Sequence, residues 1–227
     1  IIHMIRCFDS DDIQNVNPNV DPVRDLEIIE TEMRLADLES IQKRLDKKNK
    51  KNSTENEINI LETALKCIND DIKFELLFQK FSKKEINQVG LLSTKPGLYV
   101  CNVDEKSIKN GNKYTKEFIS KFGEINTIIV SADIENQINE LNEEEKINYM
   151  KMIDLKETGL NVLIKKGYNL LELQTFFTSG PEETRDGTVQ KTSLAAIDDG
   201  GLQSDFEKGY IALLTAPYSE REKIFEQ

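Results

Sequence analysis

Two short polar stretches, each directly after an apolar run, carry the residue types with which this chain could bind a small ligand. In the first, Asn102 ends an apolar run and Glu105 follows three residues later. In the second, Ser131 and Ala132 follow another apolar run. An asparagine amide both donates and accepts hydrogen bonds, whereas an ionised carboxylate only accepts them. Together these groups can contact the edge of a nucleobase.

The surrounding elements predict that the two stretches lie together. We expect strands at 97–103 and 125–131 with a helix at 113–122 between them, which is the pattern of a parallel sheet. Ligands of open parallel sheets bind just beyond the carboxyl ends of the strands. The sequence therefore predicts that both polar stretches border one hollow. Such residues also occur in ordinary loops after strands, so the motif alone leaves both interpretations open.

Upstream of these stretches, the sequence predicts one more strand and then two helices. Apolar residues dominate 1–8, which we expect to be a buried strand of the same sheet. Asp21 and Pro22 are a favourable cap and first position for a helix. Apolar residues of the second helix alternate at spacings of three and four, which is typical of a coiled-coil seam. They are Ile58, Leu61, Leu65, Ile68 and Ile72.

These patterns predict an α/β fold of three parts. Residues 21–88 are expected to form an antiparallel coiled-coil hairpin, with the second helix continuing to about residue 89 and the seam packed between its own two helices. The hairpin would be an insertion into an α/β domain made of residues 1–20 and 89–170. Within that domain, further helices are expected near 143–152 and 158–170.

The sequence of residues 171–227 predicts a small β-rich module. We expect a strand at 173–180, a turn within 185–190, a short helix at 193–201 and a strand at 208–216.

Composition excludes several classes of protein and site. The net charge of −11 over 227 residues argues against DNA binding and against a broad nucleic-acid-binding face, because phosphate recognition needs a basic surface. No apolar run is long enough to span a membrane. Cys7, Cys67 and Cys101 are an odd number at wide spacing, which predicts reduced, buried thiols. With His3 as the only histidine, expected to be structural, we predict no metal site and no catalytic constellation.

Longer strings of this sequence resemble the Obg-like ATPase family, known in bacteria as YchF. Residues 1–13, "IIHMIRCFDSDDI", resemble the family's strand after switch II, and residues 20–44 resemble the first helix of its coiled-coil insertion. The segment "LLSTKPGLYVCNVDE", residues 91–105, resembles the one that carries the family's Asn-x-x-Glu base motif. Residues 167–185 resemble the start of its C-terminal TGS module, a small β-grasp.

The resemblance implies a partial P-loop NTPase sheet and a protein that binds and hydrolyses ATP in preference to GTP, with Mg²⁺. It also implies association with ribosomes in the cytoplasm. By resemblance, Asn102, Val103 and Glu105 are nucleotide-base residues, and Ser131 and Ala132 belong to the second base loop. P-loop GTPases usually have Asn-Lys-x-Asp in the first loop, so the longer acid and the missing lysine predict a relaxed base choice.

The sequence also departs from the family. It contains no Gly-x-x-x-x-Gly-Lys-Ser/Thr motif, which in P-loop proteins holds the phosphates and Mg²⁺. We therefore expect the chain to be a fragment that lacks the phosphate loop, does not hydrolyse ATP by itself and ends within an incomplete TGS module.

The expected tip of the hairpin is basic. Its lysines are Lys47, Lys48, Lys50 and Lys51. They are compatible with contact to ribosomal RNA by phosphate neutralisation, or with a solvated loop that has no partner. Contact of these lysines with RNA would support a second hypothesis for the chain, besides nucleotide binding. The hairpin and the TGS module would then be a non-catalytic module that binds ribosomes or RNA without a nucleotide.

Overall fold

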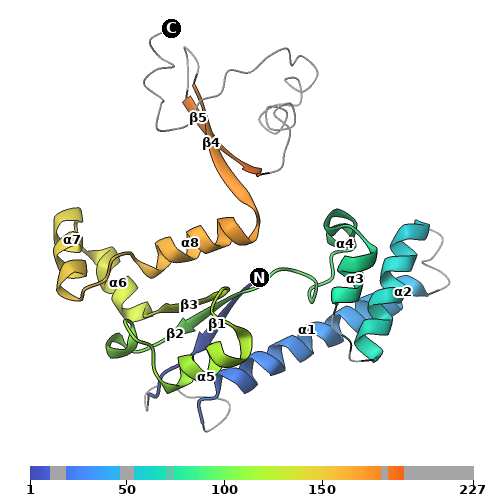
Figure 1. Cartoon of the computed structure of the whole chain (residues 1–227), viewed down its shortest axis with the longest axis horizontal. Coiled ribbons are helices and arrows are strands. Elements are labelled where there is room, and N and C mark those ends of the chain that lie inside the picture. Colours follow the sequence, from blue (N-terminus) through green and yellow to red (C-terminus); the bar gives the residue numbers. More distant parts are fainter. Residues whose placement is uncertain (11–18, 47–53, 71, 73, 180–183, 192–227) are drawn as a thin grey trace. The chain divides into compact units, whose positions relative to one another are not determined.

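The computed structural model describes residues 1–10, 19–46, 54–70, 72, 74–179 and 184–191. The chain divides into two compact units, residues 1–166 and residues 167–227. Figure 1 labels the helices and strands of both units in chain order. In the described part, no helix combines the length and apolar character that crossing a membrane requires.

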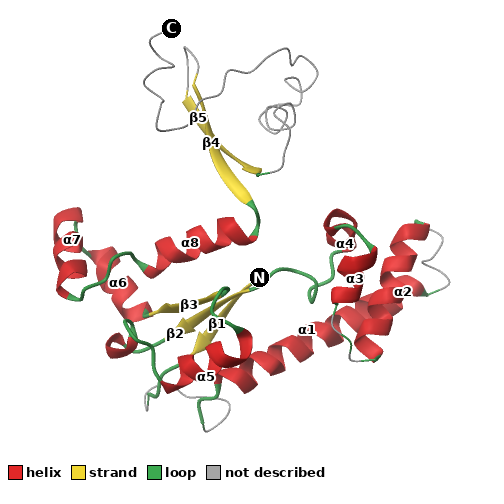
Figure 2. Cartoon of the chain, viewed as in Figure 1, coloured by secondary structure: helices red, strands yellow, loops and turns green. Residues whose placement is uncertain are grey.

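The first unit contains a three-stranded parallel sheet in the order β1-β2-β3. The strands are β1 (Ile2–Arg6), β2 (Leu98–Asn102) and β3 (Thr127–Val130), drawn as yellow arrows in Figure 2. The predicted parallel α/β sheet is thus confirmed, including the membership of the strand near the start of the chain. Because the strands are parallel, their carboxyl ends meet at one edge.

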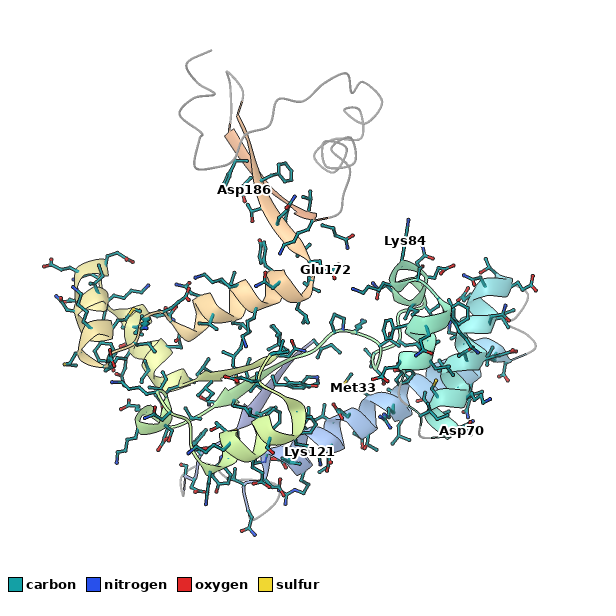
Figure 3. All side chains as sticks on the ribbon, in the orientation of Figure 1. Met33, Asp70, Lys84, Lys121, Glu172 and Asp186 are labelled. Atoms are coloured by element: carbon teal, nitrogen blue, oxygen red, sulfur yellow. The ribbon has the colours of Figure 1, made fainter. Side chains whose placement is uncertain are left out.

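One face of the sheet is covered by α5 (Lys113–Phe122) and by the start of α1 (Pro22–Leu45). Leu26 of α1 and Phe118 of α5 are fully buried against Cys101 and Val103 at the end of β2. Lys121 of α5, labelled in Figure 3, forms an ion pair with Glu27 of α1 and so joins the two helices.

The opposite face of the sheet is covered over β2 and β3 by α8 (Gly159–Leu170). Val162 and Leu163 of α8 pack against the apolar side chains of these two strands. The packing on this face does not include β1, and Met4 is 62% exposed. The prediction that β1 is buried is therefore wrong for one of its two faces, since alternate side chains of a strand point to opposite sides.

The first helix begins where the sequence predicts. Asp21 is the N-cap of α1, and its carboxylate accepts a hydrogen bond from the Arg24 amide at 2.9 Å. Pro22 occupies the first helical turn, where a missing N–H costs nothing because that group has no helical partner.

The predicted continuation of the second helix to residue 89 is wrong. The helix α2 (Glu55–Asn69) is followed by two short helices, α3 (Glu75–Lys80) and α4 (Lys83–Val89). Ser82 and Glu85 form a capping box at the start of α4, which gives the chain a strong local reason to begin a new helix there. Together with the distal half of α1, these helices form a separate small bundle, which we call the helical arm.

The arm has its own apolar core, built from four helices rather than two. Its buried members are Ile41, Ile60, Leu61, Ala64, Leu77, Ile86, Val89 and Leu91. Because α3 and α4 also pack on α2, the buried face of α2 differs from the predicted seam: Cys67 is buried, whereas Ile72 lies beyond the helix and is 43% exposed.

Two polar contacts close the arm. The Asp37 carboxylate of α1, only 2% exposed, accepts hydrogen bonds at 2.8 Å from the amides of Leu92 and Ser93. Arg44, near the end of α1, donates to the carbonyl of Val89 at 2.7 Å and pairs with Glu57 of α2. These contacts link residues far apart in the sequence, and the sequence pattern predicts neither of them.

After β2 the chain forms the short 3₁₀ turn η2 (Glu105–Ser107), and after β3 the helix α6 (Ala132–Glu140). The helix α6 was not predicted from the sequence. The helix α7 (Glu143–Met152) then begins at Asn142, whose side chain accepts from the Glu145 amide at 3.0 Å. The predicted helices at 143–152 and 158–170 are thereby confirmed.

The described part of the second unit contains an antiparallel pair, β4 (Leu173–Ser179) and β5 (Thr184–Gln190). The turn predicted within 185–190 is wrong, because these residues pair with β4 along their whole length. Gly187 lies opposite Phe176, where a β-carbon would approach the ring to 2.5 Å. The helix expected at 193–201 and the strand expected at 208–216 lie outside the described residues.

Candidate functional site

The candidate site is built on the carboxyl ends of β2 and β3. Asn102, the last residue of β2, is paired in register with Val130, the last residue of β3. Beyond them, the Val103 amide donates to the Val130 carbonyl at 2.8 Å. Asn102 and Ser131 therefore lie at the same edge of the sheet, as the parallel topology requires.

A side-chain hydrogen bond joins the two loops. The Oδ1 atom of Asn102 accepts from the Ala132 amide at 3.0 Å. On the other side, the Asn102 carbonyl accepts from the Cys7 amide after β1 at 2.8 Å. Asn102 is thus tied to both neighbouring chain segments, and its Nδ2 group has no partner among the described residues. That amide group remains available as a hydrogen-bond donor at the edge of the sheet.

Ser131 and Val103 lie at this edge but turn their side chains inward. Ser131 is 0% exposed, and its hydroxyl oxygen has no hydrogen-bond partner among the described residues, although the residue is the N-cap of α6. Val103 is buried in the core against Phe118. Both residues shape the edge through their backbone and packing, whereas Asn102, Ala132 and Glu105 are the predicted residues with solvent access.

Glu105 is exposed on η2, and α6 holds its side chain. The carboxylate atom Oε1 accepts from Nε2 of Gln137 at 2.7 Å. The Oε1 atom of Gln137 in turn accepts a hydrogen bond from the hydroxyl of Tyr149 on α7. Gln137 was not among the predicted site residues, because no helix was predicted at α6. The available signal was the pair Ile134 and Ile138 at helical spacing.

A second contact seats α6 against α8. The Glu135 carboxylate accepts from the amides of Gly159 at 2.6 Å and Leu160 at 3.3 Å, at the start of α8. Position 159 requires glycine, because a β-carbon there would lie 2.6 Å from Val130 Cγ1. The helix that carries Ala132 and Gln137 is therefore tied to the start of α8, which itself packs closely against β3.

Two thiols lie directly beneath the site. Cys7 and Cys101 are free, fully buried and hydrogen-bonded to each other. That hydrogen bond, followed by burial, raises the pKa of the Cys7 thiol far above its ordinary value. Cys7 is therefore protonated and a poor nucleophile. Cys67 is also free and buried, so the predicted burial is confirmed for all three cysteines.

Comparison with known proteins places this geometry in a family. No family model matches the chain. The "Ribosome-binding ATPase YchF" of Haemophilus influenzae is 35% identical over 96% of this chain, and that of Bacillus subtilis is 35% identical over 97%. The "Obg-like ATPase 1" of Gallus gallus is 32% identical over 97%. Over nearly its whole length, the chain is similar to YchF/Obg-like ATPases.

A solved structure agrees with this assignment. The Schizosaccharomyces pombe YchF GTPase is similar over 92% of this chain with a TM-score of 0.69 and 29% identity, and the chain covers 60% of that protein. The chain likewise spans about three fifths of the curated relatives, 62% of the Haemophilus influenzae and 59% of the Gallus gallus protein. The family and the partial P-loop NTPase fold implied by the resemblance are confirmed.

Other site predictions for this YchF-type chain stay untested. The tip lysines, Lys47, Lys48, Lys50 and Lys51, lie outside the described residues, as does most of the expected TGS module. Within the described part, no group of three His, Cys, Asp or Glu side chains lies close enough to hold a metal ion. We therefore assign no residue of this chain to Mg²⁺.

Proposed function

We propose that this chain is the base-recognition part of a purine-nucleotide-binding ATPase. The observation that carries the proposal is the hydrogen bond between Asn102 Oδ1 and the Ala132 amide, which joins the two strand-end loops into one surface. The YchF-type relatives that bear the name ATPase match over nearly the whole chain, which supports the same conclusion.

The chemistry of the exposed groups suits a purine. The Nδ2 group of Asn102 can donate to N7, an acceptor that adenine and guanine share. The Glu105 carboxylate can accept from the exocyclic amino group of the base, which adenine carries at N6 and guanine at N2. In this proposal, Asn102 selects a purine and Glu105 selects between the two purines, while Val103, Ser131 and Ala132 shape the loops.

Hydrolysis belongs to the proposal for the whole protein. ATP, GTP and Mg²⁺ would be bound by the parent protein, with phosphate and metal ligands outside this chain. Residues 1–20 and 89–170 would belong to the nucleotide-binding domain, residues 21–88 to the inserted helical arm and residues 171–227 to a TGS-like module. The relatives' name also leads us to propose a ribosomal partner and hence a cytoplasmic location.

The proposal is tested by fluorescence titration of the full-length protein with N-methylanthraniloyl ATP and GTP. We expect binding of both, with ATP favoured, and about a tenfold loss for Asn102→Ala, since one hydrogen bond to the base and one loop-joining hydrogen bond are removed. Asn87→Ala on α4, an exposed asparagine of the arm, is the matched control. Failure of the unsubstituted protein to bind either nucleotide would disprove the proposal.

The interaction-module hypothesis has its own measurement. If the tip lysines contact ribosomal RNA, cosedimentation with ribosomes should weaken steeply with salt. Replacing Lys47, Lys48, Lys50 and Lys51 with alanine should reduce both the binding and its salt dependence. If the variant cosediments with ribosomes as well as the unsubstituted protein does, these lysines do not contact ribosomal RNA.

A further inference from the structure

One helix, α6, contacts both side chains that face the proposed base. Its first residue, Ala132, donates its amide to Asn102, and its sixth residue, Gln137, donates its side-chain amide to Glu105. Five residues of α-helix separate these two contacts by about 7.5 Å along the axis. The helix therefore sets the spacing between the purine-contacting donor and the carboxylate acceptor.

The helix can do this because it is firmly seated. Ile134 and Ile138 are almost fully buried on its inner side, and Glu135 is bonded to the first amides of α8. Gln137, in contrast, is exposed. Its two hydrogen bonds go to Glu105 and Tyr149, so its side chain serves these contacts rather than the packing of the helix.

Tyr149 determines which way the Gln137 amide faces. The Tyr149 hydroxyl donates to Oε1 of Gln137, and this leaves the Gln137 NH₂ group directed at Glu105. The reverse orientation would point a carbonyl oxygen at a carboxylate, and neither group can donate. A contact from α7 thus maintains a donor next to the carboxylate.

The hydrogen bond from Gln137 affects which purine base Glu105 can bind. Gln137 occupies one oxygen of Glu105, Oε1, and leaves Oε2 for a ligand. Adenine needs only one acceptor, for its N6 amino group, whereas guanine presents two adjacent donors, N1–H and N2–H, that a carboxylate binds best with both oxygens. Resting on the nucleotide function proposed above, we infer that Gln137 and Tyr149 are positioning residues that favour adenine over guanine nucleotides by occupying one oxygen of Glu105.

The test measures selectivity rather than affinity alone. N-methylanthraniloyl ATP and GTP are titrated into the full-length protein, its Gln137→Leu variant and its Tyr149→Phe variant. Gln137→Leu frees both carboxylate oxygens and the rotation of Glu105, so the ATP affinity should fall about threefold to tenfold. The GTP affinity should stay level or rise, which lowers the ATP:GTP ratio. Tyr149→Phe should shift the ratio in the same direction by less.

Two further variants separate positioning from structural damage. Asn139→Leu places the same side chain at another exposed position of α6 and should leave the ratio unchanged. Gln137→Glu places a second carboxylate beside Glu105, and two such neighbours repel when both are ionised but share a proton when the pH falls. That variant should resemble Gln137→Leu at about pH 8 and recover ATP affinity toward about pH 5, relative to the unsubstituted protein.

The outcomes are distinguishable. A lowered ATP:GTP ratio in Gln137→Leu, with recovery of Gln137→Glu at low pH, supports the inference. An unchanged ratio, or an equal loss of both affinities, overturns the inference while the base site itself stands. Absence of binding by the unsubstituted protein overturns the inference together with the proposed function.

Discussion

The helical arm and the strand-end edge of the sheet use carboxylates in opposite ways. In the arm, Asp37 is buried, and both of its oxygens accept from backbone amides. At the strand ends, Glu105 is exposed, and Gln137 occupies one of its oxygens. A carboxylate whose oxygens both bind the protein's own backbone serves stability, whereas one with an oxygen left over can serve a ligand. Substitutions in the two regions should therefore separate stability from binding.

The largest effect is expected from the core of the arm. Leu61→Ala removes a fully buried side chain of α2 and should lower the free energy of unfolding by about 2–5 kcal/mol, because a cavity remains. Leu35→Ala on α1, where the leucine is 52% exposed, is the matched control and should change it by less than about 0.5 kcal/mol. Denaturant titration measures both, and equal effects would show that the arm does not pack as described.

Asp37 comes next. Asp37→Ala leaves the amides of Leu92 and Ser93 without their acceptor and should cost about 1.5–3 kcal/mol of unfolding free energy, as expected for hydrogen bonds to a charged group. Glu39→Ala, two positions away on the exposed face of the same helix, controls for loss of an acid. Should both variants unfold at the denaturant concentration of the unsubstituted protein, the buried carboxylate has no stabilising role.

Asn102 should show the reverse behaviour. Asn102→Ala removes a single side-chain hydrogen bond at a partly exposed edge, so the free energy of unfolding should fall by only about 0.5–1.5 kcal/mol. The same variant is the one expected to lose nucleotide affinity. A larger loss of stability than that of Leu61→Ala would contradict the separation between the two regions.

The smallest effect concerns His3 of β1, which stacks on Tyr99 with ring centroids 5.7 Å apart. Burial lowers the pKa of His3 below its ordinary value of 6.5, while Glu30 opposes the shift. The unfolded chain therefore takes up the proton first, and stability should decline as the pH falls through 6.5. His3→Gln should flatten that part of the pH profile in denaturant titrations. An identical profile in the variant would remove His3 as the cause.

Local signals in the sequence were sufficient for most of the elements that carry the site. Asp21 and Pro22 begin α1, and the apolar runs before Asn102 and Ser131 form β2 and β3. These predictions succeeded because capping and strand formation depend on residues close in the chain. The predicted continuation of the second helix was wrong beyond Asn69, because the chain there turns back so that α3 and α4 pack against α2.

The sequence by itself determined the parallel sheet, the edge at which Asn102 and Ser131 meet, and the similarity to YchF/Obg-like ATPases. Only the tertiary structure decided that Asn102 bonds to Ala132, that Gln137 holds Glu105, and that Asp37 is buried beneath the loop at Leu92 and Ser93. Helix and strand periodicity is set by near neighbours, whereas these contacts join residues about 30 or more positions apart. Which polar group receives which partner is fixed when the elements pack, because burial then penalises every group left without one.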